Sequence, residues 1–166
     1  EAIKMINKYL RTAVFEPTNP VGRNGMAVAQ YIAGMAFSNV GLGVVHGMAH
    51  PMGSLFDIPH GVANAMLLPT IMEFNAPVCL DKYVEIAKAM NAYKEGMSKE
   101  EAATAACNAV KELAIEVGIP QHLTEIGIKE EDIPALAEQA ISDVCTPGNP
   151  REVTLEDIIA LYKKVL

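Results

Sequence analysis

The sequence contains only three cysteines, Cys79, Cys107 and Cys145, which are widely spaced and include no C-x-x-C pair. Neither a disulfide framework nor a thiolate zinc site is therefore indicated. This scarcity fits instead a protein of the reducing cytoplasm, which is where we expect this one to work.

Clustered positive charge is also absent. The chain has 13 Lys and Arg residues scattered among 20 Asp and Glu residues, for a formal net charge of -7. Because phosphate binding needs clustered cations, we expect no nucleic-acid partner. No uninterrupted apolar run approaches the roughly 20 residues that span a bilayer, so we expect a soluble protein with no membrane partner.

Long runs of alternating apolar and polar residues, which would indicate strands, are lacking too. Apolar residues recur instead at the three-to-four spacing of helices. At the start of the chain Ile3, Ile6, Leu10 and Val14 form one apolar stripe that stops before Pro17. This pattern predicts a first helix of about 14 residues.

Caps and helix-breaking residues indicate further helices. Ser98 and Glu101 form a capping-box pattern, which opens a helix that ends before Gly118. The other predicted helical segments are residues 61–75, with a kink or break at Pro69, and residues 80–90, 129–144 and 154–165. The sequence therefore predicts an all-α fold, a single domain over residues 1–166 with about seven to nine helices.

The stretch from Gly25 to Phe56 is rich in Ala, Gly, Met and Val and almost free of charge. Helices with this composition are apolar nearly all round, so we expect them at the centre of the domain. The opening residues, from Glu1 onward, already follow a helical pattern, with no leader before them. We expect the sequence to begin inside a longer protein.

Three of the four histidines, His46, His50 and His60, fall in one stretch of fifteen residues that is otherwise nearly free of polar side chains. On a helix His46 and His50 share one face, and a turn at Pro59 can bring His60 back toward them. Imidazole is the commonest side-chain ligand for iron, zinc and related ions, so the spacing predicts a divalent-metal site. A single buried histidine is more often a core residue with satisfied ring nitrogens, but three together favour a site. His122 is expected to be structural or solvated.

Two further residues have ordinary structural interpretations when taken alone. Cys145 follows a predicted helix in the turn-rich segment DVCTPGNP, where it could line a pocket wall but is expected to be structural. Phe37 lies in AGMAFSN, on a segment predicted to pack centrally, and is expected in the core.

Two segments carry a resemblance to a known family. The stretch AGMAFSNVGLGVVHGMAHPMGSLFDIPHGVANAMLLP resembles the signature region of iron-containing (group III) alcohol dehydrogenases, and the tail DVCTPGNPREVTLEDIIALYKKVL resembles the end of the same family. Within the family the lactaldehyde reductase (propanediol oxidoreductase) and 1,3-propanediol dehydrogenase branches are the most similar. The resemblance covers essentially the whole chain.

The resemblance implies the C-terminal, all-helical domain of the dehydroquinate synthase-like fold, which holds a metal in the cleft against an N-terminal dinucleotide-binding domain. It makes His46 and His60 metal ligands and moves His50 to the nicotinamide side, where it assists proton movement. His50, His60 and Cys145 then border the cofactor, and Phe37 borders the substrate pocket. An Asp and a His from an upstream helix, which complete the metal site in the family, are absent from this sequence, as is any G-x-G-x-x-G loop.

The implied activity is hydride transfer between a primary alcohol or diol and NAD or NADP, with ferrous iron, or zinc in some members, as the metal. The dinucleotide would be held by the domain that this chain lacks. We therefore expect the isolated chain to be inactive, and its uncovered apolar face to favour a homo-oligomer. The alternatives are a glycerol dehydrogenase-like or dehydroquinate synthase-like metalloenzyme domain, or a non-catalytic helical module.

Overall fold

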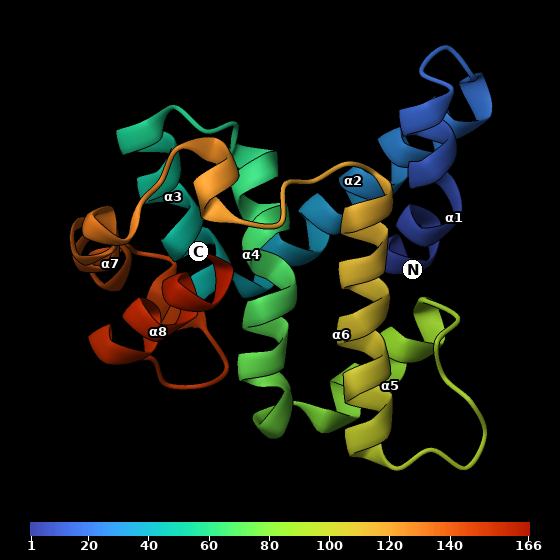
Figure 1. The fold of residues 1–166 in the computed structure, drawn as a ribbon. Coiled ribbons are helices and arrows are strands. Elements are labelled where there is room, and N and C mark those ends of the chain that lie inside the picture. Colours follow the sequence, from blue (N-terminus) through green and yellow to red (C-terminus); the bar gives the residue numbers. More distant parts are fainter. The chain divides into compact units, whose positions relative to one another are not determined.

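The computed structural model describes residues 1–166 and is all-helical, with eight α-helices and no strand (Figure 1). This confirms the predicted fold class and helix number. The α-helices are α1 (Ala2–Phe15), α2 (Pro20–Val40), α3 (Val44–Phe56), α4 (His60–Asn75), α5 (Leu80–Ala89), α6 (Lys99–Glu116), α7 (Ile133–Ser142) and α8 (Leu155–Val165). Short 3-10 turns precede α5, lie on both sides of α7, and follow α6.

Most helix ends lie where the caps and breakers predict them. The predicted capping box between Ser98 and Glu101 opens α6, with both reciprocal hydrogen bonds present. Pro69 is the exception, because α4 continues through it without interruption. A proline removes one backbone donor, but the buried surroundings of Pro69 hold the helix together, so the prediction of a break there is wrong.

The chain divides into two compact units. Unit 1 comprises residues 1–41 and 79–117 and contains α1, α2, α5 and α6. Glycines allow α1 and α2 to pack closely as a helical hairpin. A side chain at Gly25 would collide with the ring of Tyr9, and a Cβ at Gly22 would lie 2.7 Å from the backbone nitrogen of Ala13.

Within unit 1, α2 departs from the sequence-based expectation. Helices between Gly25 and Phe56 were expected at the centre of the fold, yet the only buried residues of α2 are Gly22 and Ala29. Apolar composition predicts that a helix needs a covering partner, but it does not say that this chain provides one. Large apolar side chains of α2 are therefore exposed, namely Val21, Val28, Tyr31, Met35, Phe37 and Val40.

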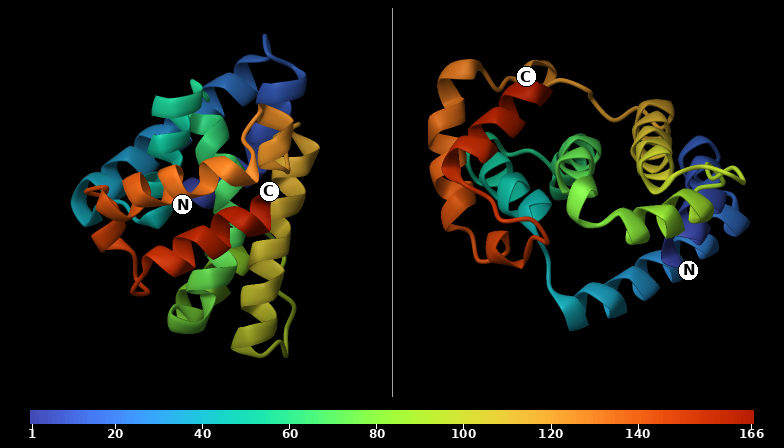
Figure 2. Two further views of the ribbon diagram at one scale, coloured as in Figure 1. Left: turned by 60° about the vertical axis from the view of Figure 1, so that its left-hand side comes forward. Right: turned by 90° about the horizontal axis from the view of Figure 1, so that it is seen from below.

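Unit 2 comprises residues 42–78 and 118–166 and contains α3, α4, α7 and α8. Here the expectation of a central apolar helix is correct, because α3 contacts both α4 and α7 (Figure 2). Apolar side chains of all four helices form one core. Its largest fully buried members are Tyr162, Met48, Met52, Leu67, Ile71, Leu123, Ile128, Ile133, Leu136, Ile158 and Val44.

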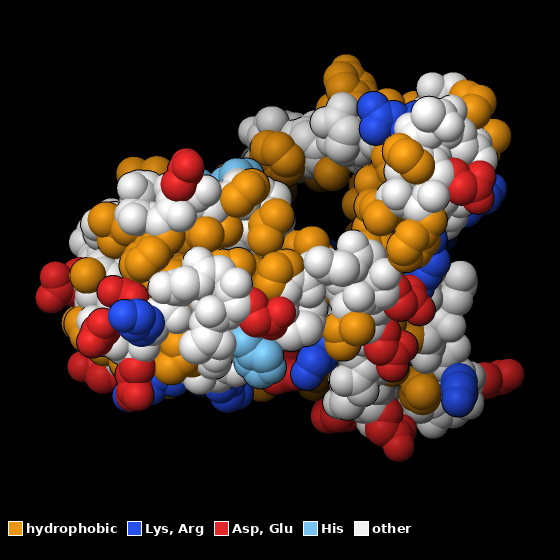
Figure 3. All heavy atoms as spheres, turned by 45° about the horizontal axis from the view of Figure 1, so that its top comes forward, with side chains coloured by type: hydrophobic (Ala, Val, Ile, Leu, Met, Phe, Trp, Pro, Cys, Tyr) orange, Lys and Arg blue, Asp and Glu red, His pale blue; other side chains and the backbone are white.

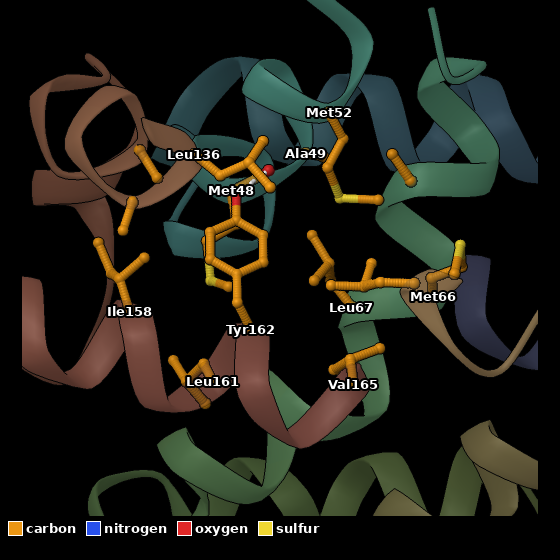
Figure 4. Packing of buried hydrophobic residues seen from close by; sticks show 14 of the residues in the cluster. Met48, Ala49, Met52, Met66, Leu67, Leu136, Ile158, Leu161, Tyr162 and Val165 are labelled. Carbon is orange, nitrogen blue, oxygen red and sulfur yellow. Dashed lines mark hydrogen bonds between the residues drawn. The ribbon is translucent and has the colours of Figure 1, made fainter. Parts of the chain in front are cut away.

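Tyr162 of α8 is the largest side chain in this core, and it points toward Met48 of α3 (Figure 4). Its hydroxyl donates a hydrogen bond to the carbonyl oxygen of Met48, 2.6 Å away. Burial raises the pKa of the Tyr162 phenol well above its usual range, so the group stays a neutral donor. The bond satisfies the one polar atom of a fully buried side chain.

Figure 3 shows how charged side chains are distributed on one face of the molecule. On the face drawn in Figure 3, Lys and Arg side chains stand among acidic ones without forming a continuous basic patch. No single helix combines the length and hydropathy needed to cross a membrane; α2 and α3 meet that test only as a bent pair.

Candidate metal centre

Helix α3 and the first residue of α4 carry the three clustered histidines, all within unit 2. His46 and His50 lie one turn apart on α3, and His60 opens α4. The connection reverses the chain through Asp57, which adopts a left-handed conformation with φ 56° and donates its N–H to the carbonyl of Gly53. The sharp C-terminal turn of α3 thereby returns His60 to the face that carries the other two.

The three imidazoles form a compact triangle. The ring centroids of His46 and His60 are 5.3 Å apart, those of His50 and His60 are 5.6 Å apart, and those of His46 and His50 are 6.0 Å apart. The predicted grouping from the H-x3-H-x9-H spacing is thus present in the fold. Two imidazoles that bind one ion through nitrogen at about 2.0–2.1 Å have centroids roughly 5 Å apart, so the His46 and His60 pair fits a shared ion.

The environment of His46 favours the neutral ring that a metal requires. Burial lowers the pKa of the His46 imidazole, and the neighbouring rings of His60 and His50 lower it further. The carboxylate of Asp143 acts in the opposite direction but does not prevail. His46 is therefore held as a neutral nitrogen donor.

His50 differs from the other two because it has a carboxylate partner. Its Nδ1 lies 2.8 Å from Oδ2 of Asp143, a residue that follows the last turn of α7. The second carboxylate oxygen of Asp143 accepts the backbone N–H of Cys145, at 2.8 Å. Burial works to raise the pKa of the Asp143 carboxyl, but the hydrogen bonds from Cys145 and His50 outweigh it and the pKa is lowered.

Donor atoms of His50, Asp143 and Cys145 all lie within 4.8 Å of one another, a spacing that a metal ion could also bridge. We interpret this group as a hydrogen-bonded network, since both oxygens of Asp143 are already engaged by His50 and Cys145. The thiol of Cys145 is a poor ligand here, because burial and the adjacent Asp143 raise its pKa and so disfavour the thiolate. The predicted ligand pair of His46 and His60 is the better interpretation.

Asn64, one turn after His60 on α4, contacts the third histidine. Its amide nitrogen donates to the His60 carbonyl oxygen at 2.9 Å and lies 3.2 Å from Nε2 of the His60 ring. The amide oxygen of Asn64 is buried without a hydrogen-bond partner. Buried polar groups without a partner are uncommon, and this amide oxygen is available to a donor beside His60.

The remaining predicted site residues are distributed over both units. Cys145 lies in unit 2, next to the His50 partner Asp143, as part of the turn that leads into the 3-10 helix Thr146–Gly148. Phe37 belongs to α2 of unit 1, and its side chain is exposed rather than in the core. The expectation of Phe37 as a core residue is wrong, whereas its assignment to the substrate pocket stays a prediction.

Asp143 is the site residue that sequence reasoning missed. It lies 93 positions from His50, so no spacing rule connects the two. One signal was present, because an acidic side chain at the C-terminal end of a helix is opposed by the helix dipole. Such a position indicates that the carboxylate has a partner elsewhere.

The all-helical fold brings three histidines of adjacent helices together in one candidate site. The chain belongs to the Fe-containing alcohol dehydrogenase family, whose C-terminal domain matches residues 1–166. Lactaldehyde reductase of Escherichia coli (strain K12) is 61% identical over 137 residues, which cover 82% of this chain and 36% of that protein. The 1,3-propanediol dehydrogenase of Citrobacter freundii is 42% identical over 164 residues, which cover 99% of this chain and 42% of that protein.

Solved structures give the same result. A crystal structure of 1,3-propanediol oxidoreductase matches with a TM-score of 0.97 at 42% identity, and it covers 99% of this chain and 43% of the other. The alcohol dehydrogenase from Oenococcus oeni matches with a TM-score of 0.96 at 41% identity, with the same coverage of both chains. The chain thus spans less than half the length of these relatives.

Proposed function

We propose that this chain is the metal-binding helical half of an alcohol dehydrogenase that transfers hydride between a primary alcohol or diol and NAD(P). The observation that carries the proposal is the convergence of His46, His50 and His60 at the junction of α3 and α4. Relatives named lactaldehyde reductase, 1,3-propanediol dehydrogenase and NAD-dependent methanol dehydrogenase support the reaction class and the cofactor.

His46 and His60 would hold the metal as neutral nitrogen donors, with Fe(II) as the proposed ion and Zn as the alternative. When bound, the ion would supply a Lewis acid that lowers the pKa of an alcohol hydroxyl and polarises the carbonyl of the product. Two imidazoles are only part of a coordination shell, so further donors must come from residues outside this chain. The dinucleotide would likewise be held outside this chain, which has no G-x-G-x-x-G loop.

His50 would accept the proton that the alcohol hydroxyl releases. The carbon that bears this hydroxyl would transfer its hydride to the nicotinamide. A neutral imidazole can accept a proton and the imidazolium can return it, so His50 suits this transfer in both directions. Cys145 would border the nicotinamide end of the cofactor, and His60 would lie between the metal and the cofactor. Phe37 would border the substrate.

We further propose that the enzyme works in the cytoplasm on a small alcohol or aldehyde and forms a homo-oligomer. The exposed apolar side chains of α2 support association, either with the remainder of the enzyme or with a second copy. By itself the 166-residue chain, a single metal-binding domain in this proposal, is expected to have no dehydrogenase activity.

The test uses the whole enzyme that carries this chain, loaded with Fe(II) without oxygen and assayed with 1,2-propanediol and NAD+ or NADP+. We expect NAD(P)H formation that chelation abolishes, and that His46→Ala abolishes together with metal binding. His122→Ala, at an exposed histidine of unit 2, is the matched control and should be active. Absence of turnover with any primary alcohol or diol by a metal-loaded enzyme would contradict the proposal and favour the glycerol dehydrogenase-like or dehydroquinate synthase-like alternative.

A further inference from the structure

The hydrogen bond between His50 and Asp143 joins two parts of unit 2 that are distant in sequence. Oδ2 of Asp143 lies 2.8 Å from Nδ1 of His50, within the range of a strong charge-assisted bond. The Asp143 side chain is 16% exposed, whereas that of His50 is 39% exposed. The carboxylate is therefore the more buried partner, and the ring is the partner that a ligand can reach.

The Asp143 carboxylate is itself fixed in place by the turn after α7. Oδ1 accepts the N–H of Cys145 two residues on, which is the pattern of an Asx turn. The backbone N–H of Asp143 donates to the carbonyl of Ala140, and that carbonyl also accepts the hydroxyl of Thr146 at 2.6 Å. Oδ1 is thus engaged in this turn, and Oδ2 faces His50.

Gly47 lets this turn approach α3 closely enough for the bond to form. A Cβ at Gly47 would collide with the hydroxyl of Thr146. Because Gly47 precedes His50 by about one turn of α3, the contact places the Asp143 turn beside the histidine. The absence of a side chain at Gly47 thus allows Asp143 to reach His50.

Two features indicate that the Asp143 carboxylate orients the His50 imidazole. First, the helix dipole disfavours a carboxylate after the last turn of a helix, so another interaction must offset this unfavourable one. Second, no Lys or Arg forms an ion pair with Asp143; its ion-pair partner is His50. A carboxylate that is partly buried, oriented and paired with one imidazole nitrogen is the arrangement that sets a histidine tautomer.

We infer that Asp143 is a positioning residue, which holds His50 with its proton on Nδ1 and leaves Nε2 as the acceptor of the alcohol proton. This inference rests on the proposed function for the identity of the proton donor. An ionised carboxylate can only accept, so Nδ1 must donate and Nε2 must carry the lone pair. When the substrate O–H bond breaks, its proton forms a bond to Nε2, and the resulting imidazolium is stabilised by Asp143 until water removes the proton.

The first test reads the tautomer without requiring activity. The 166-residue chain has only four histidines, so two-bond 1H–15N spectra of the metal-free, histidine-labelled protein at alkaline pH resolve each ring. We expect His50 to be protonated on Nδ1. In Asp143→Asn, Oδ1 can keep the Cys145 N–H, so the amide group faces His50 and forces the proton to Nε2. His50→Asn assigns the signals, and Asp143→Ala provides a second variant that removes the acceptor entirely.

The second test measures kinetics in the whole enzyme that carries this chain. We expect Asp143→Asn to lower kcat by about a hundredfold or more, with KM and metal content little changed, because the general base is then in the wrong tautomer. Asp143→Glu, which keeps a carboxylate, should recover part of the loss. Glu138→Gln, at an exposed carboxylate on α7, is the matched control and should behave as wild type.

Two results would overturn the inference. One is a His50 tautomer that is the same in wild type, Asp143→Asn and Asp143→Ala. The other is a changed tautomer with an unchanged kcat. If the wild-type enzyme oxidises no alcohol, the proposed function fails on its own, and the tautomer spectra still decide whether Asp143 orients His50.

Discussion

The hydroxyl of Tyr162 and the carbonyl oxygen of Met48 form a hydrogen bond of 2.6 Å inside the core of unit 2. The two residues lie 114 positions apart, and they join α8 to the helix that carries His46 and His50. The bond therefore couples the stability of the C-terminal helix to the position of the site.

Replacement of Tyr162 by Phe tests this coupling. The variant keeps the buried ring but leaves the Met48 carbonyl with one partner fewer, so we expect a loss of about 1 kcal/mol in the free energy of unfolding. Urea unfolding followed by circular dichroism measures the change. Tyr31→Phe is the matched control, because Tyr31 is exposed on α2, and its unfolding midpoint should not move. Equal midpoints for Tyr162→Phe and wild type would contradict the prediction.

The contact between Gly47 and Thr146 gives a second prediction. A methyl group at Gly47 would collide with the Thr146 hydroxyl, so Gly47→Ala should cost about 1–3 kcal/mol through overpacking. Gly34→Ala is the control within a helix, since the nearest atom to its added Cβ is 4.0 Å away, on Phe37. It should raise stability by up to about 1 kcal/mol through helix propensity. Thermal unfolding of the two variants should shift in opposite directions; a stabilised Gly47→Ala protein would refute the packing argument.

Helix positions could be predicted from the sequence because their signals are local. The stop before Pro17 and the capping box at Ser98 depend on residues within one turn, and both agree with the structure. Burial could not be predicted in the same way. Helix α2 is as apolar as α3 in composition, but only α3 finds partners on several sides within this chain.

The candidate site could likewise be predicted only in part. The grouping of His46, His50 and His60 follows from helical periodicity and one turn, so spacing was sufficient to predict it. The partnership of His50 with Asp143 depends on the packing of α7 against α3, which brings together residues far apart in sequence. Helical periodicity contains no information on such a contact.

The roles proposed for the three histidines lead to a prediction about metal content. In the whole enzyme that carries this chain, His60→Ala should lose most of the bound metal, because one of two imidazole ligands disappears. His50→Ala should keep near-normal metal but turn over roughly 10²–10⁴-fold more slowly, as expected for loss of a proton acceptor. Elemental analysis together with steady-state kinetics separates the two. Loss of metal in His50→Ala would show that His50 is a ligand and that the division of roles is wrong.

The lowered pKa of Asp143 predicts how stability depends on pH. The carboxyl titrates near its ordinary 3.8 in the unfolded chain and below it in the native state. The unfolded state therefore binds its proton first as the pH falls. The resulting contribution to stability is complete well above 3.8 and is lost as the pH falls through the native value. We expect the difference in free energy of unfolding between wild type and Asp143→Asn to shrink across this range, as measured by urea unfolding between pH 6 and pH 3. Ser142→Ala alters a neutral neighbour and should differ from wild type by a constant amount. A wild-type advantage over Asp143→Asn that stays constant to pH 3 would show that the carboxylate is not held in its charged form by the Cys145 and His50 bonds.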